Sequence, residues 1–151
     1  MVVQCIALWC ITPLGKVLLK TENSKNYIQD ISGPFKAWQR KSESKEGVVF
    51  RLFQREFGEY LPVKSFRLHF AKQVEEAFLF HGILAIRSHY LCKLPFDLYT
   101  DSPTIICVGK EDLARIVNIT DKNNTFGEDI ILYDFDCNIL FKILGIQTII
   151  I

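Results

Sequence analysis

One well-bounded amphipathic segment, set among β-branched runs, most constrains how this chain of 151 residues can fold. Apolar side chains recur at every fourth residue and predict a helix over Ser44–Phe57 with a single apolar face. Ser44 is a suitable N-cap, and Glu46 places a negative charge in the first turn, where it favours the helix dipole. Gly58 stands where a C′ glycine would follow, so we expect the helix to end there.

The segments around this helix have the composition of strands, turns and shorter helices. Val2–Ile11 and Lys16–Thr21 flank a Pro-Leu-Gly turn and predict a β-hairpin. The mixed order differs from regular strand–helix alternation and favours an α/β fold, an α/β/α sandwich with a central mixed β-sheet. The length favours one domain over residues 1–151. Further predictions are a surface loop at Glu22–Gly33, a strand at Val63–Phe70, a central strand buried on both faces at Glu76–Ser88, a loop at Leu91–Pro103, a strand at Thr104–Val108, a short helix at Lys110–Val117 and a longer helix at Phe126–Leu144.

The segment Ala37–Glu59 resembles the Nudix box, whose general form is G-x5-E-x7-R-E-U-x-E-E-x-G-U, with U a bulky apolar residue. The matching residues are Glu43 on the first glutamate, Arg51 on the arginine, Phe53 on the first apolar position, Glu56 on the last glutamate and Gly58 on the closing glycine. Weaker likenesses at Gly15–Leu19, Phe78–Ile86 and Thr104–Val117 extend along the chain. The resemblance implies a Nudix-like fold and, in an active member, hydrolysis of a diphosphate linked to another moiety with Mg²⁺ or Mn²⁺.

The departures from the box fall mainly on its carboxylates. Leu52 and Arg55 replace two of the three glutamates of the R-E-U-x-E-E core, Ala37 replaces the first glycine, and Glu59 replaces the final apolar residue. Positions 52, 55 and 56 share one helix face, and hard cations require oxygen ligands. We therefore expect a box without most of its metal ligands. By the resemblance, Glu43, Arg51 and Gly58 would brace the loop against the helix.

A second register of the box is an alternative. It places the segment Arg55–Glu59 on R-E-U-x-E and restores two acids. It also loses the match at Glu43 and places Gly58 inside the helix, which costs about 1 kcal/mol. We therefore prefer the first register.

The function predicted from these residues is that of a Nudix-fold pseudoenzyme. It would bind a nucleotide-like ligand, a nucleoside diphosphate linked to another group, or a protein partner, with little or no hydrolysis. The candidate ligand-binding residues are Lys36, Arg40, Arg51 and Arg55; Glu56 is a weak catalytic candidate, and Glu56 and Glu59 are the metal candidates if there is a metal. No cofactor is expected, with Mg²⁺ or Mn²⁺ required only by an active enzyme.

Two alternatives stay open. One is an active pyrophosphohydrolase that recruits Glu59, Glu75 or Glu76, although these acids and the three histidines are interpreted first as surface or core residues. The other is an interaction module, with the apolar tail Ile146–Ile151 as a homodimer contact.

Composition excludes several other classes of function. Eighteen basic against seventeen acidic residues give no basic excess, which argues against a nucleic-acid partner. Five scattered cysteines without a C-x-x-C pair give no zinc site and indicate reduced, buried thiols in a cytoplasmic protein. No apolar run is long enough to span a membrane, so no membrane partner is expected.

Overall fold

The computed structural model describes residues 2–23, 30–61, 68–120 and 129–145. The chain divides into two compact units: unit 1 contains residues 1–13 and 35–100, and unit 2 contains residues 14–34 and 101–151. The expectation of a single domain stays a prediction. In the described ranges, no helix is long and apolar enough to cross a membrane.

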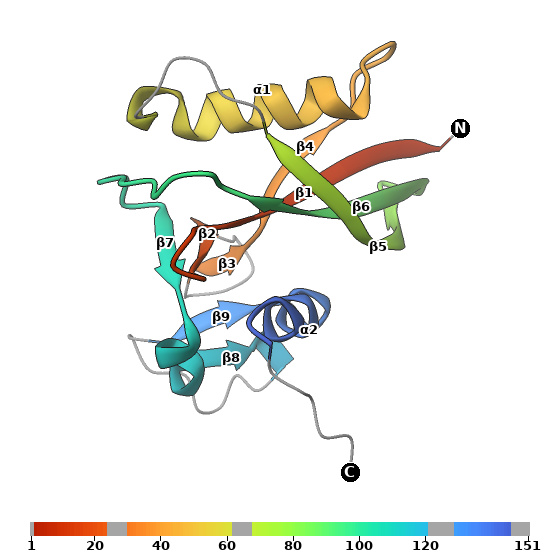
Figure 1. Ribbon diagram of the computed structural model, residues 1–151. Helices are drawn as coiled ribbons and strands as arrows, with labels where there is room; N and C mark the ends of the chain where they lie inside the picture. The colour runs from red at the N-terminus through yellow and green to blue at the C-terminus, as the bar shows by residue number, and fades with distance from the viewer. Residues whose placement is uncertain (1, 24–29, 62–67, 121–128, 146–151) are drawn as a thin grey trace. The chain divides into compact units, whose positions relative to one another are not determined.

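Unit 1 is a mixed four-stranded sheet with one helix against it. The central strand β1 pairs in parallel with β6 and antiparallel with β4, and β5 pairs antiparallel with β6. Helix α1 packs on β4 and β1 (Figure 1). The rings of Phe35 and Phe57 meet edge to face there, with their centroids 4.8 Å apart. Its elements are β1 (Val3–Ile11), β4 (Phe35–Trp38), α1 (Lys45–Phe57), the 3-10 turn η1 (Gly58–Tyr60), β5 (His69–Phe80) and β6 (Ile83–Lys93).

Unit 2 combines a three-stranded antiparallel sheet, in the order β3–β2–β7, with a parallel pair of short strands. Ile31, Ile119 and Ile131 form a buried apolar cluster, and β3 lies against β9. Its elements are β2 (Val17–Glu22), β3 (Ile31–Gly33), β7 (Ile105–Val108), the 3-10 helix η2 (Lys110–Arg115), β8 (Ile116–Asn118), β9 (Ile130–Leu132) and α2 (Asp134–Ile143).

Much of the predicted element order is confirmed. The strands at the start of the chain are separated by a turn with Gly15 at φ +80°, and the strand before Val108 is present. The helix begins after Ser44 and ends at Phe57 as expected. Gly58 does not adopt the left-handed conformation of a C′ glycine, because the chain continues from its right-handed φ of −52° into η1.

The prediction of one central strand over Glu76–Ser88 is wrong. The segment turns back at His81 and Gly82, whose φ angles are +50° and +78°, so that β5 and β6 form a hairpin. Two residues with positive φ form the tight turn that matches the twist of paired strands. The two apolar runs on either side of the turn have the composition of one buried strand, and hydrophobicity alone does not distinguish a buried run from an exposed one.

Three other boundaries differ because tertiary pairing overrides the local pattern. Ile31–Gly33, expected within a loop, pairs with β2, and Ile116–Val117, expected within a helix, belongs to β8. The β-branched Ile130–Leu132 pairs with β8, so the last helix begins at Asp134. Residues 63–67, 126–128 and the tail Ile146–Ile151 lie outside the described ranges. Four cysteines are buried as expected, whereas Cys107 is exposed.

Candidate functional site

The start of α1 is fixed by hydrogen bonds that belong to its own sequence. Ser44 has an extended backbone, and its Oγ accepts a hydrogen bond of 3.0 Å from the backbone N–H of Gly47. A Cβ on Gly47 would lie only 3.2 Å from Ser44 Oγ and 3.3 Å from Glu43 Cγ. The glycine therefore costs helix propensity but leaves room for the cap and for Glu43 beside it.

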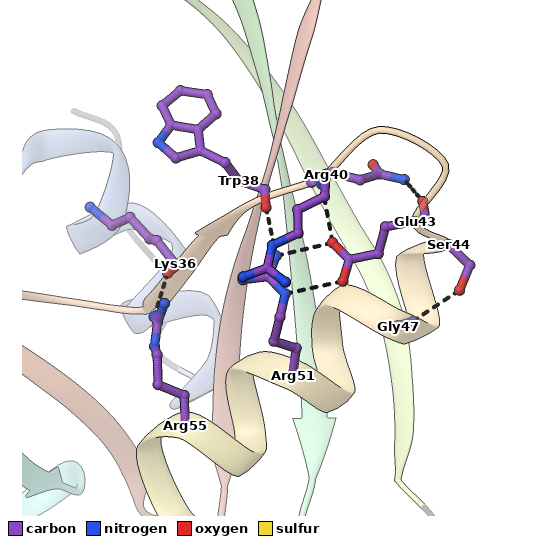
Figure 2. Close-up of polar contacts among 9 residues, drawn as sticks. Lys36, Trp38, Arg40, Glu43, Ser44, Gly47, Arg51 and Arg55 are labelled. Atoms are coloured by element: carbon purple, nitrogen blue, oxygen red, sulfur yellow. Dashed lines mark hydrogen bonds and ion pairs between the residues drawn. The ribbon is translucent and has the colours of Figure 1, made fainter.

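Arg51 joins the loop before the helix to the helix itself (Figure 2). Its Nε and one terminal nitrogen donate to the two carboxylate oxygens of Glu43, each at 3.0 Å. Glu43 Oε1 also accepts from the backbone N–H of Arg40 at 3.1 Å. The bond from Arg51, followed by that from the Arg40 backbone, lowers the pKa of the Glu43 carboxyl. This two-point contact closes the loop over residues 40–43.

Arg51 and Arg55 also attach α1 to strand β4. Arg51 donates to the carbonyl of Trp38 at 2.8 Å, and Arg55 donates to the carbonyl of Lys36 at 2.9 Å (Figure 2). Four residues of helix rise about 6 Å, and two residues of strand rise about 6.6 Å. Because these spacings match, arginines four apart reach carbonyls two apart. Both guanidinium groups thus have structural partners.

The box position of Leu52 lies in the protein core. Its side chain is 0% exposed, and it belongs to the buried face of α1 with Val48, Val49, Phe53 and Phe57. The resemblance implies that a glutamate at this position of an active box offers a carboxylate oxygen to the metal. In this protein the leucine at the same position packs in the core.

Glu56 is the one carboxylate among positions 52, 55 and 56. Its side chain is 10% exposed, and Arg55 Nε lies 3.3 Å from its Oε1. Glu59 is exposed on η1, and within the described ranges neither acid belongs to a group of three candidate metal ligands. A hard divalent cation needs several oxygen ligands and is repelled by a guanidinium. The residues at the box therefore do not fit a resident Mg²⁺ or Mn²⁺.

The acids proposed as substitutes lie apart. Glu75 and Glu76 are neighbours on β5, so their side chains point to opposite faces of the sheet. Glu75 pairs with Lys72 and accepts from Ser88 Oγ at 3.3 Å. The pair cannot hold one ion together.

Glu76 belongs to a polar chain that the sequence did not predict. His89 is 0% exposed; its Nδ1 accepts a hydrogen bond of 3.0 Å from Trp9 Nε1, and its Nε2 lies 2.8 Å from Glu76 Oε1. Indole only donates, so Nδ1 carries no proton and Nε2 donates to Glu76. Burial opposes ionisation of Glu76, but the bond from His89 and the charge of Arg87 outweigh it and lower the pKa of its carboxyl. No local motif links residues 80 positions apart.

Lys36 and Arg40, the remaining candidate ligand residues, flank Trp38 at the end of β4 (Figure 2). Arg40 is exposed and Lys36 is half-buried. Lys36 and Arg40 thus lie on β4 or just after it, and Arg51 and Arg55 lie on α1. Each of these two arginines donates a hydrogen bond to a backbone carbonyl of β4.

Comparison with known proteins shows which fold carries this site. No protein-family model matches the sequence, and no curated protein matches it. Solved structures do match, among them a NUDIX-family hydrolase from Clostridium perfringens, with 13% identity over 96% of this chain and 97% of that one and a TM-score of 0.56. The chain has the Nudix fold. The α/β fold class with a mixed sheet and the resemblance to Nudix proteins are therefore confirmed.

Two other solved structures also match this chain. The Ap4A hydrolase of C. elegans is 19% identical, covering 75% of this chain and 84% of its own, with a TM-score of 0.51. The C-terminal domain of mouse MUTYH, solved in complex with human PCNA, is 13% identical, covering 95% and 87%, with a TM-score of 0.58. At these identities the likeness concerns the fold alone.

Proposed function

We propose that this Nudix-fold chain binds a nucleotide-like ligand, a nucleoside diphosphate joined to another group, with little or no hydrolysis. The observation that carries the proposal is the complete burial of Leu52 in the core, at a position where the box has a glutamate. With Arg55 beside Glu56, the helix face that would hold a metal presents an apolar group, a guanidinium and one carboxylate. Positions 52, 55 and 56 thus offer one carboxylate, which is too few ligands for a cation that activates water.

The basic residues support the binding half of the proposal. Lys36 lies within β4, Arg40 follows two residues after its end, and the side chain of Arg55 is 51% exposed. Lysine and arginine neutralise phosphate charge without a metal. The similarity in fold to an Ap4A hydrolase makes nucleotides joined through phosphates the first ligands to test.

Thermal unfolding with a panel of nucleoside diphosphates, nucleotide sugars and dinucleoside polyphosphates tests the proposal. We expect a rise in melting temperature that is the same with and without Mg²⁺, because a ligand that binds the native state stabilises it. Lys36→Ala and Arg40→Ala should reduce this rise, whereas Lys142→Ala, an exposed residue at the end of α2, should not.

A hydrolysis assay with the same panel tests the second half. Turnover that requires Mg²⁺ or Mn²⁺ and disappears in Glu56→Gln would show that the protein is an enzyme and would overturn the proposal.

The second candidate is a protein-binding module, favoured by the similarity to a MUTYH domain that was solved with PCNA. No thermal response to any nucleotide would favour that candidate.

A further inference from the structure

The turn end of the β5–β6 hairpin exposes large apolar side chains to solvent. We define the hairpin tip as residues 79–84. Leu79 is 74% exposed, and Phe80, Ile83 and Leu84 are 43%, 40% and 45% exposed. Single exposed apolar residues are ordinary on protein surfaces, but a contiguous group marks a binding surface.

The exposed side chains project from both faces of the hairpin. Leu79 is paired with Leu84, and Phe80 is paired with Ile83. Paired residues share a face and successive residues alternate, so the two pairs point in opposite directions. The ten residues from Ala77 to Ile86 include no Asp, Glu, Lys or Arg. A flat protein partner would cover one of these faces and leave the other in water, whereas an apolar medium that surrounds the tip would cover both.

An exposed tryptophan borders the tip. The ring of Trp38 lies 4.9 Å from that of Phe80 and 6.2 Å from that of Phe78, measured between centroids, and Trp38 is 37% exposed. Figure 2 shows this ring directed away from α1. Tryptophan is enriched at membrane–water interfaces, because its ring is apolar and its N–H is polar.

The loop after Trp38 carries exposed positive charge. Arg40 and Lys41 are exposed within a few residues of Trp38, so the loop and the tip lie at the same end of unit 1 (Figure 1). Glu43, the acid of the same loop, is paired with Arg51. Glu46, on the first turn of α1, offsets one of the two positive charges of Arg40 and Lys41, so a small positive excess remains. An anionic surface complements this charge.

We propose that the hairpin tip inserts into the interface of a lipid bilayer that contains anionic lipids. Leu79, Phe80, Ile83 and Leu84 enter the boundary between headgroups and acyl chains, Trp38 lies at headgroup level, and the loop with Arg40 and Lys41 faces the lipid charge. Reversible attachment of this kind combines shallow apolar insertion with electrostatic attraction. It needs no membrane-spanning helix, and of the proposed nucleotide-binding residues it shares only Arg40.

Sedimentation with phosphatidylcholine vesicles, with and without phosphatidylserine, tests this inference on the full chain. We expect binding that is stronger with phosphatidylserine and weaker at high salt. The double substitution Leu79→Ser and Leu84→Ser should weaken binding by about tenfold or more, since it removes apolar surface from the inserted part. Leu14→Ser is the matched control, because Leu14 is 75% exposed in a turn outside the tip, and it should bind as the unaltered protein does.

The two tryptophans of the chain provide a second readout. Trp9 is 0% exposed and should not respond to lipid, whereas Trp38 should shift its emission to shorter wavelength when vesicles are added. Trp38→Phe should abolish the shift and keep sedimentation. Absence of binding to both vesicle types would overturn the proposal. So would self-association that the Leu79→Ser and Leu84→Ser variant abolishes, since the tip would then be a contact between copies.

Discussion

Helix α1 and the β5–β6 hairpin both lie in unit 1, and both carry dense apolar sequence, yet they use it in opposite ways. Leu52 on α1 is 0% exposed, whereas Leu79 on the hairpin is 74% exposed. The sequence predicts the helix to within one residue, but it predicts a buried central strand where the structure has the hairpin. Apolar residues at helical spacing gather on one face of the helix and leave the opposite face polar. This contrast identifies the face that packs against the rest of the protein. An unbroken apolar run has no such contrast and does not reveal whether anything covers it.

The largest expected effect tests the buried half of this comparison. Leu52→Glu restores the glutamate of the box, but it also places a carboxylate in the core. We expect the free energy of unfolding to fall by about 4 kcal/mol, with no gain of metal-dependent hydrolysis. Chemical denaturation measures the loss, and Leu52→Met, which keeps the volume, should cost less than about 1.5 kcal/mol. A stable Leu52→Glu variant that hydrolyses nucleotides with Mg²⁺ would contradict the burial argument.

The next effect concerns the middle of the β5–β6 hairpin, where Glu76 on β5 contacts Arg87 and His89 on β6. Glu76→Gln weakens the contacts to His89 and leaves Arg87, which packs 4.5 Å from the Phe78 ring centre, without its counter-charge. We expect a loss of about 1–2 kcal/mol, reduced by partial solvent screening. Glu75→Gln alters the neighbouring acid, whose ion pair with Lys72 is exposed, and should change stability far less. Equal losses would show that the two faces of β5 are equivalent.

The brace at the start of α1 should depend on pH. Glu43 has a lowered pKa, so its pairing with Arg51 stabilises the native state above the ordinary carboxyl pKa of 4.5 and is lost as pH falls through the lower native value. Glu43→Gln should therefore lower the melting temperature at neutral pH, and the difference from the unaltered protein should shrink below about pH 4.5. Melting curves from neutral to acid pH measure it. A difference that grows with acid would contradict the ion pair.

The turn of the hairpin should be sensitive to its glycine. Gly82 has φ +78°, so Gly82→Ala introduces a Cβ into a left-handed backbone and should cost about 1 kcal/mol. His81 has φ +50°, and His81→Asn should be tolerated, because asparagine adopts this conformation more readily than most residues. Denaturation midpoints distinguish the two. Insensitivity of both positions would favour the continuous strand over the turn.

The smallest effect is expected at the exposed tip. Leu79→Ala should change the free energy of unfolding by less than about 0.5 kcal/mol, because the side chain already contacts water. Leu8→Ala in β1, where the leucine is 0% exposed, should cost about 2–5 kcal/mol. The same measurement on both variants settles the comparison. A cost at Leu79 that approaches that at Leu8 would show that the tip is covered in solution.

The candidate site was predictable where its residues are close in sequence. Glu43, Ser44 and Arg51 lie within a span of nine residues, and the motif placed the acid beside the arginine, where the structure has their 3.0 Å contact. The bonds of Arg51 and Arg55 to β4 were not predictable, because they depend on how a strand and a helix align. A carboxylate or a ligand phosphate is the partner expected for Arg55 from the sequence, and in the structure Arg55 contacts the Glu56 carboxylate and also the Lys36 carbonyl. Whether the four basic candidates also bind a ligand stays a prediction.

His81-Gly82 between two apolar runs carried a turn signal that could have located the hairpin, since a residue tolerant of positive φ followed by glycine favours a two-residue turn. The chain from Trp9 through His89 to Glu76 had no comparable signal. Its members come from three strands and meet only after the parallel pairing of β1 with β6 and the antiparallel pairing of β6 with β5.

The sequence by itself determined the box helix, its cap, its apolar face and the order of elements that indicated the α/β class. These features depend on interactions within a few residues, where chain geometry leaves few arrangements. Only the tertiary structure decided that Leu52 packs in the core, that two arginines bind strand carbonyls, and that an apolar hairpin tip stays in solvent. Burial is a property of what lies against a side chain, and that neighbour is supplied by a distant part of the chain.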